Sequence, residues 1–406
     1  MKLTLEQKSN LESEILKQVR AEPGLSRIEL AREMRIAPST VGNYVGRLIV
    51  EGFLSESPAE TENAEIEVGR PATALRLNPD GGEFIGVDFE ARNIMAMSVD
   101  FSDTPVKHVH KRIEESDTIA QILRKIEQAV TAVLPGNRSR LLAIGIGVPG
   151  LVDPDRGIAI DYKYIHNWHD VELTAPLAAE FGVPVYLENT VRSMALAEMW
   201  FGQGRGQDNF LCLGIRSGIG AGIVTGGQLV RGSAHRAGEI GRWRFPWPRS
   251  DVASFFIDGN PPDEPDVELQ EIASVRAILG ALERARRVRG KTVLSAQSDR
   301  LTFDDVVRAA QQRDALTAQV LGVAAEMLGQ AISQLVLALN SSRVILAGPL
   351  TLLGDTLLHP MRAKAEELLT ACGGDVPAII NSTMGEYSGA LGAAALAVHE
   401  WKPRRA

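Results

Sequence analysis

The sequence predicts a winged helix-turn-helix at the N-terminus, followed by a larger α/β body. Helical periodicity, helix-capping residues and a tight turn between residues 26 and 54 predict the first part. Strand-like apolar runs that alternate with helical segments beyond residue 82 predict the second part. The turn-forming stretch Asn78-Pro79-Asp80-Gly81-Gly82 marks the boundary between them.

Length and composition limit the class of protein. A chain of 406 residues is too long for one ordinary domain, so we expect two or three units that each bury a core. Its 45% hydrophobic and 23% charged residues are typical of a globular protein and exclude a disordered or fibrous chain. With 43 Lys and Arg residues against 51 Asp and Glu residues, any nucleic-acid surface must be a local patch.

Cysteine usage and apolar runs indicate a cytoplasmic protein. Cys212 and Cys372 are the only cysteines, and neither has a second Cys or a His at metal spacing, so the sequence predicts neither a disulfide framework nor a thiolate zinc site. Met1 to Asn10 is polar and lacks the apolar core of a secretory signal. Runs such as Leu335 to Leu339 are far too short to span a membrane.

Two helices are expected before residue 36. Apolar residues between Leu5 and Val19 recur near the helical period, and Pro23-Gly24 ends that pattern. Ser26 and Glu29 have the spacing of a capping box, which places the start of a second helix. Leu25 and Leu30 suit the hydrophobic staple across the same cap.

The next helix has the features of a recognition helix. Pro38 suits its first position, and the buried stripe is formed by Val41, Val45 and Leu48. The residues left facing outward are Ser39, Thr40, Asn43 and Arg47. Asn43 can pair with adenine, Ser39 and Thr40 can reach base edges or phosphates, and Arg47 is placed for phosphate. Two glycines inside this helix, Gly42 and Gly46, weaken the prediction because each costs about 1 kcal/mol relative to Ala.

A β-hairpin wing is expected after the helices. The polar stretch Ser55 to Glu67 leads to Val68-Gly69-Arg70-Pro71 and then to Leu75-Arg76-Leu77. Arg70 stands in a stiff turn and can enter a narrow minor groove. The sequence therefore predicts a double-stranded DNA operator as partner. The alternative is a protein-docking module with ordinary solvated polar faces.

Strands and helices alternate through the body. Strands are expected at Glu83 to Asp88, Ile94 to Asp100, Ala143 to Val148, Leu211 to Ile215 and Val344 to Ala347. Helices are expected at Ile119 to Val133 and Leu316 to Leu339. Two strand-rich halves predict a bilobal body with a cleft.

With these elements in place, the chain resembles the ROK family of repressors, open reading frames and sugar kinases, in its winged-helix repressor branch. The telling segments are Val68-Gly69-Arg70-Pro71, Gly145 to Asp153, Ser217 to Gly222, Ala237-Gly238-Glu239-Ile240-Gly241 and Gly389 to Ala394. Each glycine-rich segment alone is weak evidence for the family, so the resemblance depends on the order in which these segments occur. The resemblance implies a bilobal actin-like, ribonuclease-H-like fold with a sugar site in the cleft. It implies a DNA-binding domain at residues 1–79, a first lobe at 80–187 completed by about 386–402, and a second lobe at 188–385.

Two departures from the family argue against phosphoryl transfer. Kinases of the family place an Asn-Asp pair against the sugar, with the Asp as base, whereas this chain has Asn189-Thr190. A threonine hydroxyl does not accept a proton near neutral pH, so no catalytic residue and no nucleotide cofactor are expected. The phosphate turn reads Asp88-Phe89-Glu90-Ala91-Arg92, in which Phe89 and Glu90 are expected to crowd and repel a triphosphate. The alternative is that Glu188 replaces the base.

A third departure removes the family's zinc site, so no metal is expected. The family places a His after Glu-x-Gly and then a cluster of cysteines, but here Arg242 follows Gly241 and Trp243 to Glu268 contains no Cys. His235 alone is expected to be a polar surface or cleft residue. Aromatic packing by Trp243, Phe245 and Trp247 is expected to replace the metal.

The resemblance also implies which residues bind a ligand. They are Asn189, Thr190, Glu239, Arg242 and Gln270, of which Arg242 replaces a His and Gln270 replaces a Glu. Arg242 suggests an anionic ligand such as a sugar phosphate or sugar acid, and the alternative is an ion pair with Glu239. Trp168 is expected either to stack on a sugar or to cap the lobe.

We therefore expect a carbohydrate-responsive transcription regulator, a repressor, that acts as a homodimer or higher homo-oligomer. The first alternative is an ATP-dependent sugar kinase with an appended DNA-binding domain. The second is a constitutive docking protein with a vestigial ligand site. Enzymatic turnover and ligand titration distinguish the three.

Overall fold

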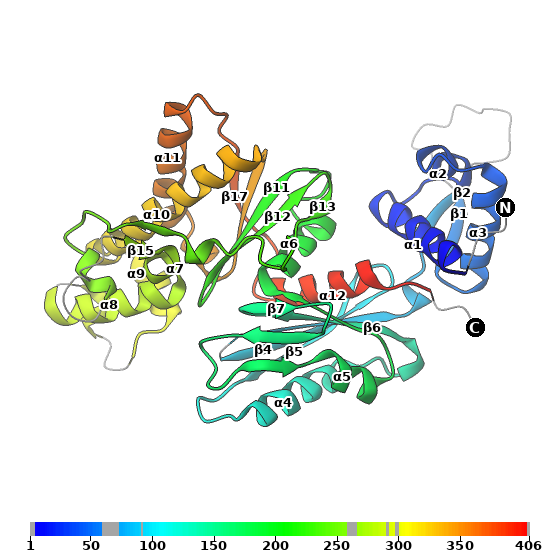
Figure 1. Cartoon of the computed structure of the whole chain (residues 1–406), viewed down its shortest axis with the longest axis horizontal. Helices are drawn as coiled ribbons and strands as arrows, with labels where there is room; N and C mark the ends of the chain where they lie inside the picture. Colours follow the sequence, from blue (N-terminus) through cyan, green and yellow to red (C-terminus); the bar gives the residue numbers. More distant parts are fainter. Residues whose placement is uncertain are drawn as a thin grey trace. The chain divides into compact units, whose positions relative to one another are not determined.

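The computed structural model describes residues 5–58, 73–90, 92–257, 266–289, 292–296 and 300–403 (Figure 1). The chain divides into two compact units. The first contains Met1–Glu188 and Ala393–Ala406, and the second contains Asn189–Gly392. The first unit therefore holds the helix-turn-helix together with one lobe of the body, and the second unit holds the other lobe.

The N-terminal module has the predicted helices and hairpin. Its elements are α1 (Leu5–Ala21), α2 (Arg27–Glu33), α3 (Pro38–Val50), β1 (Leu54–Pro58) and β2 (Thr73–Leu77), with β1 and β2 antiparallel. The capping box of Ser26 and Glu29 is present at the start of α2, and Pro38 is the first residue of α3. These predictions are confirmed because they depend on residues within one helical turn of each other.

A five-stranded sheet forms the centre of the first lobe. Its strand order is β10 (Val185–Asn189), β6 (Leu141–Val148), β3 (Glu83–Phe89), β4 (Asn93–Asp100) and β5 (Pro105–Arg112). β3 and β6 are parallel, while β3, β4 and β5 form an antiparallel meander. The sequence did not reveal β5, because this edge strand is mostly exposed and carries His, Lys and Arg instead of an apolar run.

The other elements of the first lobe are two helices and a small sheet. The helices are α4 (Ile119–Ala132) and α5 (Thr174–Phe181), and the small sheet contains β7 (Leu151–Asp153), β8 (Ile158–Asp161) and β9 (His169–Glu172). Part of α12 (Ser388–Glu400) packs on β6 at Gly145, where a Cβ atom would lie 1.8 Å from the Ala393 carbonyl oxygen. Only glycine permits this close contact.

The second unit has its own five-stranded sheet. The order is β13 (Gln228–Leu229), β12 (Ile219–Thr225), β11 (Phe210–Ile215), β16 (Arg343–Ala347) and β17 (Ala378–Asn381). Its helices are α6 (Thr190–Phe201), α7 (Leu269–Ala273), α8 (Val275–Arg289), α9 (Phe303–Gln311), α10 (Ala315–Leu339) and α11 (Asp355–Ala371). A separate two-stranded sheet pairs β14 (Arg244–Pro246) with β15 (Asp266–Glu268).

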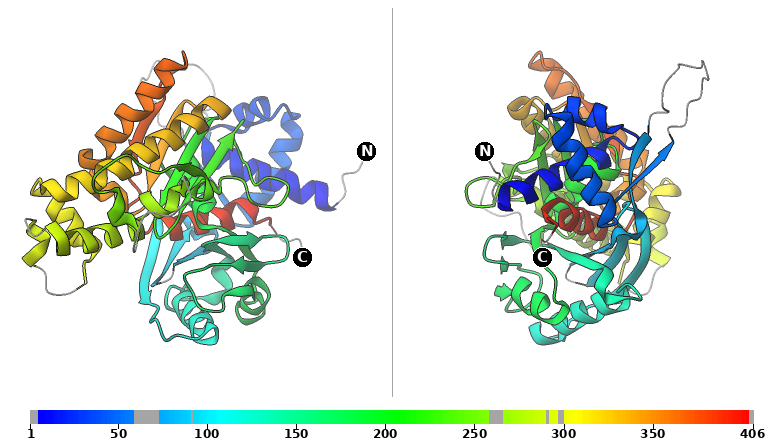
Figure 2. Two further views of the ribbon diagram at one scale, coloured as in Figure 1. Left: turned by 60° about the vertical axis from the view of Figure 1, so that its left-hand side comes forward. Right: turned by 90° about the vertical axis from the view of Figure 1, so that its right-hand side faces the viewer.

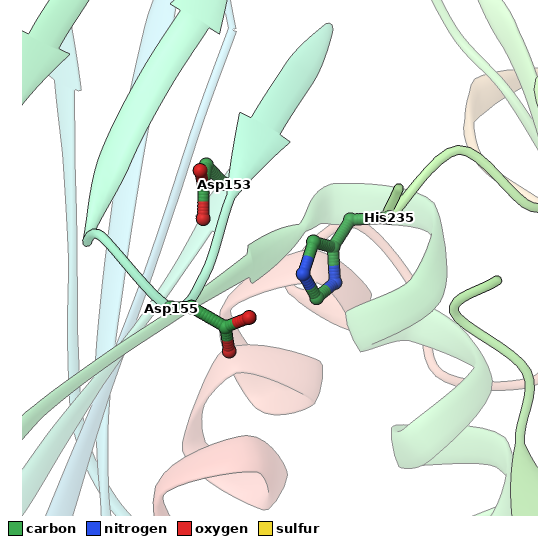
Figure 3. Close-up of side chains that lie close together, drawn as sticks. All are labelled: Asp153, Asp155 and His235. Carbon is green, nitrogen blue, oxygen red and sulfur yellow. The ribbon is translucent and has the colours of Figure 1, made fainter. Parts of the chain in front are cut away.

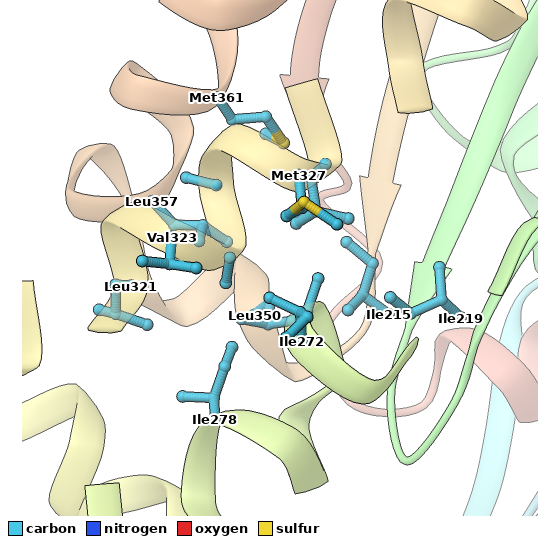
Figure 4. Close-up of a cluster of buried hydrophobic side chains, with 14 of the residues drawn as sticks. Ile215, Ile219, Ile272, Ile278, Leu321, Val323, Met327, Leu350, Leu357 and Met361 are labelled. Carbon is cyan, nitrogen blue, oxygen red and sulfur yellow. The ribbon is translucent and has the colours of Figure 1, made fainter. Parts of the chain in front are cut away.

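The core of the second unit forms where its helices meet the sheet. Side chains of α10 such as Val323 and Met327 pack with Met361 of α11, Ile272 of α7 and Ile215 of β11 (Figure 4). Among the described residues, α10 is long and apolar enough to cross a membrane, but 72% of its apolar window is buried. Its hydrophobicity is thus explained by its place in this core.

The N-terminal module is joined to the first lobe by a buried contact. Four rings from distant parts of the chain pack together at centroid separations of 5.1 to 5.9 Å. We call this cluster the aromatic junction, and it consists of Phe53, Phe84, Phe101 and Trp401. Trp401 follows directly after α12, so the C-terminal end of this helix lies near the N-terminal module (Figure 2).

Candidate DNA-binding surface and effector site

The outward face of α3 carries the residues predicted to contact DNA. Val41, Val45 and Leu48 are fully buried, which orients the helix in its module. Ser39 and Asn43 are exposed and Thr40 is half-buried, so these three polar side chains lie on the side of α3 away from the module core. A helix with this polar face has the shape and chemistry to enter a major groove.

Arg47 has partners inside the module. Its Nη1 donates to Glu12 Oε1 at 3.0 Å, and its guanidinium lies 5.6 Å from the centroid of the Tyr44 ring. The Arg47 side chain is 46% exposed, whereas that of Glu12 is buried. The pair therefore ties α3 to α1 and holds the Arg47 guanidinium at the surface. Glu12 was not among the predicted residues, because its partner is 35 positions away.

The root of the wing is fixed to the turn between α1 and α2. The backbone N–H of Leu75 in β2 donates to the Leu25 carbonyl, and the N–H of Gly24 donates to the Leu75 carbonyl, both at 2.9 Å. Leu75 is fully buried. Arg70, the residue predicted to enter a minor groove, lies outside the described residues.

Asn189 and Thr190 stand at the start of α6 in the second unit. Asn189 is the N-cap, and its Oδ1 accepts hydrogen bonds from the backbone N–H groups of Val191 at 2.9 Å and Arg192 at 3.4 Å. Thr190 is the first helical residue and is only 3% exposed. The cap fixes the Asn189 side chain, and Thr190 directly follows it as a buried residue of α6.

Glu239 and Arg242 belong to a loop that packs on β12. The backbone of Gly238 lies against β12, since a Cβ atom there would fall 1.7 Å from the Ala221 carbonyl oxygen, and its φ is +84°. A short 3₁₀ helix, η3 (Ile240–Arg242), follows, with Glu239 immediately before it. Gly238 thus places the Glu239 side chain at a fixed distance from the sheet.

The positive charges of three arginines act on the Glu239 carboxyl group. Burial raises the pKa of Glu239, while the positive charges of Arg192, Arg242 and Arg236 oppose this rise. Arg192 is only 2% exposed, and its Nη1 donates to the Ala237 carbonyl at 3.4 Å. Arg192 was not among the predicted residues, because no local pattern links the first turn of α6 to the η3 loop.

Gln270 lies beside the same loop. Its Nε2 donates to Glu268 Oε2 at 2.5 Å, and a Cβ atom on Gly241 would lie 3.4 Å from Gln270 Cβ. On the other side, a Cβ atom on Gly218 would lie 3.6 Å from Gln270 Oε1. Gln270 therefore lies between the glycine-rich start of β12 and η3, in the neighbourhood of Arg242.

One prediction for the segment that begins at Asp88, near the end of β3, is wrong. The Phe89 side chain is fully buried and meets Trp168 edge to face at 5.3 Å, so it is part of the core of the first lobe. The expectation that Phe89 crowds a triphosphate is wrong, because its ring packs in the core of the first lobe against Trp168. Trp168 is fully buried in the same contact and caps the lobe, which excludes it as a stacking surface for a sugar.

The aromatic residues that follow Arg242 pack in the second unit, as expected for Trp243, Phe245 and Trp247. Phe245 is buried in the core of the second unit, and Trp243 and Trp247 pack against that core. The β14 and β15 strands hold this segment, with Phe245 opposite Val267. Hydrophobic packing and strand pairing stabilise this segment.

Two acidic residues, Asp153 and Asp155, lie at the end of β7 and in the turn that follows it (Figure 3). Asp153 is the last residue of β7, and its Oδ1 accepts from the Arg156 backbone N–H at 3.1 Å. Asp155 is two residues further on and is exposed. In the second unit, His235 is half-buried and has a φ of +53°.

Comparison with known proteins identifies both parts of the chain. Residues 84–400 match the ROK family, and residues 9–55 match a winged helix-turn-helix DNA-binding family. Over 354 residues the chain is 28% identical to a putative xylose repressor of Caldicellulosiruptor sp. (strain Rt8B.4), with 86% of this chain and 85% of that protein covered. Over 317 residues it is 29% identical to a glucokinase of Halalkalibacterium halodurans, with 76% of this chain and 93% of that protein covered.

A solved structure supports the same fold. The crystal structure of a ROK family transcriptional regulator, described as a homologue of the Escherichia coli MLC protein, superposes with a TM-score of 0.73 at 23% identity. The alignment covers 97% of this chain and 96% of that chain. The predicted fold class, a winged helix-turn-helix followed by a ROK body, is therefore confirmed.

Proposed function

The chain belongs to the ROK family, in the branch that carries a winged helix, and from this premise we propose that it is a transcriptional repressor controlled by a carbohydrate or sugar derivative. The observation that carries the proposal is the N-terminal module. Its α3 exposes Ser39 and Asn43 while it buries the opposite face. A helix built in this way reads base edges in the major groove.

Each polar residue of α3 has a distinct role in this proposal. Asn43 pairs with a base and Ser39 and Thr40 contact base edges or phosphates, while Arg47 and Arg70 contact the sugar-phosphate backbone or the minor groove. The pair with Glu12 positions Arg47 without burying it, since 46% of the Arg47 side chain is exposed. A dimer presents two such helices to a palindromic operator.

The proposal includes the loss of kinase activity. Thr190 occupies the first position of α6, directly after the cap, where a base must act on the sugar hydroxyl in a kinase of this family. The remaining candidate base is the buried Glu188. An assay for ATP-dependent phosphorylation over a panel of sugars tests this point, and turnover that is lost in Glu188→Gln would establish the kinase instead.

The effector binds at the residues gathered around the start of α6 and the η3 loop. Asn189, Glu239 and Gln270 offer amide and carboxylate groups of the kind that bind sugar hydroxyls. The positive charges of Arg192, Arg236 and Arg242 act on the single carboxyl group of Glu239. This favours an effector that carries an anionic group, and a xylose repressor among the relatives supports a sugar as its framework.

One experiment tests the DNA and effector parts together. Purified protein selects bound duplexes from genomic DNA at low ionic strength, and a carbohydrate panel that includes sugar phosphates and sugar acids is then tested for release. We expect a defined duplex and at least one sugar that releases it. Absence of binding to every fragment would reject the repressor.

The roles of two residues can be separated on the selected duplex. Asn43→Ala should lower the affinity for the selected duplex and relax the preference for its bases. Arg47→Ala should lower the affinity for every DNA sequence and reduce the salt dependence of binding. Equal losses on the selected and random duplexes for both variants would contradict these roles. Arg242→Ala should abolish release by an anionic sugar while it leaves DNA binding intact.

A further inference from the structure

Arg27 connects the three elements that approach DNA. It is the first residue of α2, and it lies between Ser26 and Glu29, the two residues of the capping box. From there its guanidinium reaches the first strand of the wing and the middle of α3.

The contact with the wing is a bidentate ion pair between Arg27 and Glu56. Arg27 Nε donates to Glu56 Oε1 at 2.6 Å, and Nη2 donates to Glu56 Oε2 at 3.0 Å. The parallel arrangement of two N–H donors and two carboxylate oxygens fixes the direction as well as the distance. Glu56 lies in β1 opposite Leu75, the residue that roots the wing in the module.

The contact with α3 uses the remaining side of the same guanidinium. Nη1 donates to the Gly42 carbonyl oxygen at 3.2 Å, and a Cβ atom on Gly46 would lie 4.0 Å from Nη1. The guanidinium thus lies along the face of α3 that carries the two glycines. It meets the helix on the backbone, one residue before Asn43.

We propose that Arg27 is a positioning residue for DNA recognition, which sets the angle between the wing and α3 without contacting DNA. The wing and a recognition helix contact neighbouring grooves, so their mutual angle decides whether both contacts form on one duplex. A half-exposed ion pair of this kind adds little to folding stability. Its effect is on the geometry of the folded module, and the proposal depends on the DNA binding proposed above.

The competing role for an exposed arginine is direct contact with phosphate. The two roles predict opposite results for Glu56→Gln. If Arg27 binds phosphate, removal of the Glu56 charge releases a cation toward the duplex and strengthens binding. If Arg27 positions the wing, the same change weakens binding even though a negative charge near DNA has been removed.

The experiment measures affinity for the duplex selected from genomic DNA, over a series of salt concentrations. We expect Arg27→Ala, Arg27→Lys and Glu56→Gln each to lower affinity, roughly tenfold for the alanine variant, with less than additive loss in the Arg27→Ala/Glu56→Gln double variant. Lysine keeps the positive charge but cannot form the bidentate pair with Glu56. The salt slope should remain that of the wild type.

The control is Glu33→Gln, which removes the same charge from an exposed position at the end of α2. It should bind as tightly as the wild type or slightly more tightly. All variants should keep the wild-type melting temperature within a few degrees, because a partly exposed ion pair contributes little to folding stability.

The proposal is overturned if Glu56→Gln binds more tightly than Glu33→Gln, or if Arg27→Ala reduces the salt slope by about 0.9, the loss of one phosphate contact. It is also overturned if Arg27→Lys binds like the wild type. A wild-type protein that binds no duplex is a different outcome, since it rejects the repressor proposed above and leaves the contacts of Arg27 as structural ones.

Discussion

Replacement of Arg20 by Met removes the cation from a buried ion pair between the N-terminal module and the first lobe. Arg20 Nε lies 2.7 Å from Asp103 Oδ2, and the two side chains are 6% and 11% exposed. Arg20 Nη2 also donates to the Phe101 carbonyl at 3.2 Å, so the side chain reaches the aromatic junction. Loss of one partner of such a pair costs about 3–5 kcal/mol. We expect about 3 kcal/mol, because the Asp103 carboxyl group can relieve part of the cost by taking up a proton.

The size of this defect should depend on pH. Burial raises the pKa of Asp103 above its ordinary value of 3.8, and Arg20 opposes the rise, so the Arg20→Met change raises the pKa further. A carboxyl group whose pKa is raised by folding stabilises the folded state. This stabilisation is complete at pH values below the pKa of the group in the unfolded chain, and it is lost as the pH rises through the pKa of the group in the folded protein. Arg20→Met should therefore be nearly harmless at about pH 4 and most harmful at neutral pH.

Hydrogen exchange of peptides from α1 measures the effect locally. At neutral pH a loss of about 3 kcal/mol corresponds to exchange roughly 100-fold faster than in the wild type, provided that the module opens locally. The matched variant combines Arg20→Met with Asp103→Asn, which removes both charges, and Asn accepts the φ of +70° at this position. It should recover most of the protection. The reasoning is refuted if the double variant exchanges as fast as Arg20→Met, or if the ratio to wild type does not change with pH.

Three other changes test different parts of the structure. Trp401→Ala opens the aromatic junction and should cost about 3–5 kcal/mol in thermal denaturation, while Trp401→Phe should retain most of the stability. Gly42→Ala should raise the melting temperature by the equivalent of about 0.5–1 kcal/mol, since a Cβ atom at this position meets no neighbouring atom within 4 Å. A melting temperature below that of the wild type would show that the glycine has a structural role. Gly238→Ala should abolish the thermal shift caused by the effector, because its Cβ would lie 1.7 Å from the Ala221 carbonyl oxygen and must displace the loop that carries Glu239. A normal shift in this variant would separate Glu239 from the effector site.

Much of the fold could be predicted before the structure, and the reason is the range of the interactions involved. The capping box of Ser26 and Glu29 and the buried stripe of Val41, Val45 and Leu48 join residues within a few turns of one helix. Apolar runs likewise predict buried strands such as β3 and β6, whose residues are buried along nearly their whole length. The exposed edge strand β5 has no such run and was missed.

The candidate site could be predicted only in part. The Asn189-Thr190 pair and the Glu239 to Arg242 segment carry a local pattern, and the resemblance to a family assigns that pattern a role. Nothing local indicates that Arg192 faces Glu239, since the two are joined by the packing of α6 and the η3 loop on the same sheet. The direction of the Phe89 ring was misjudged for the same reason, because its partner Trp168 is far along the chain.

Short-range patterns in the sequence thus predict the helices and the buried strands of this protein. The sequence also shows that neither Cys212 nor Cys372 has a second cysteine or a histidine at metal-binding spacing. Tertiary packing decides which charges meet, as in the pairs of Arg27 with Glu56, Arg47 with Glu12 and Arg20 with Asp103. The physical reason is that a cap or a buried stripe stabilises a segment through its own neighbours, whereas an ion pair between distant residues forms only after the elements that carry them have packed.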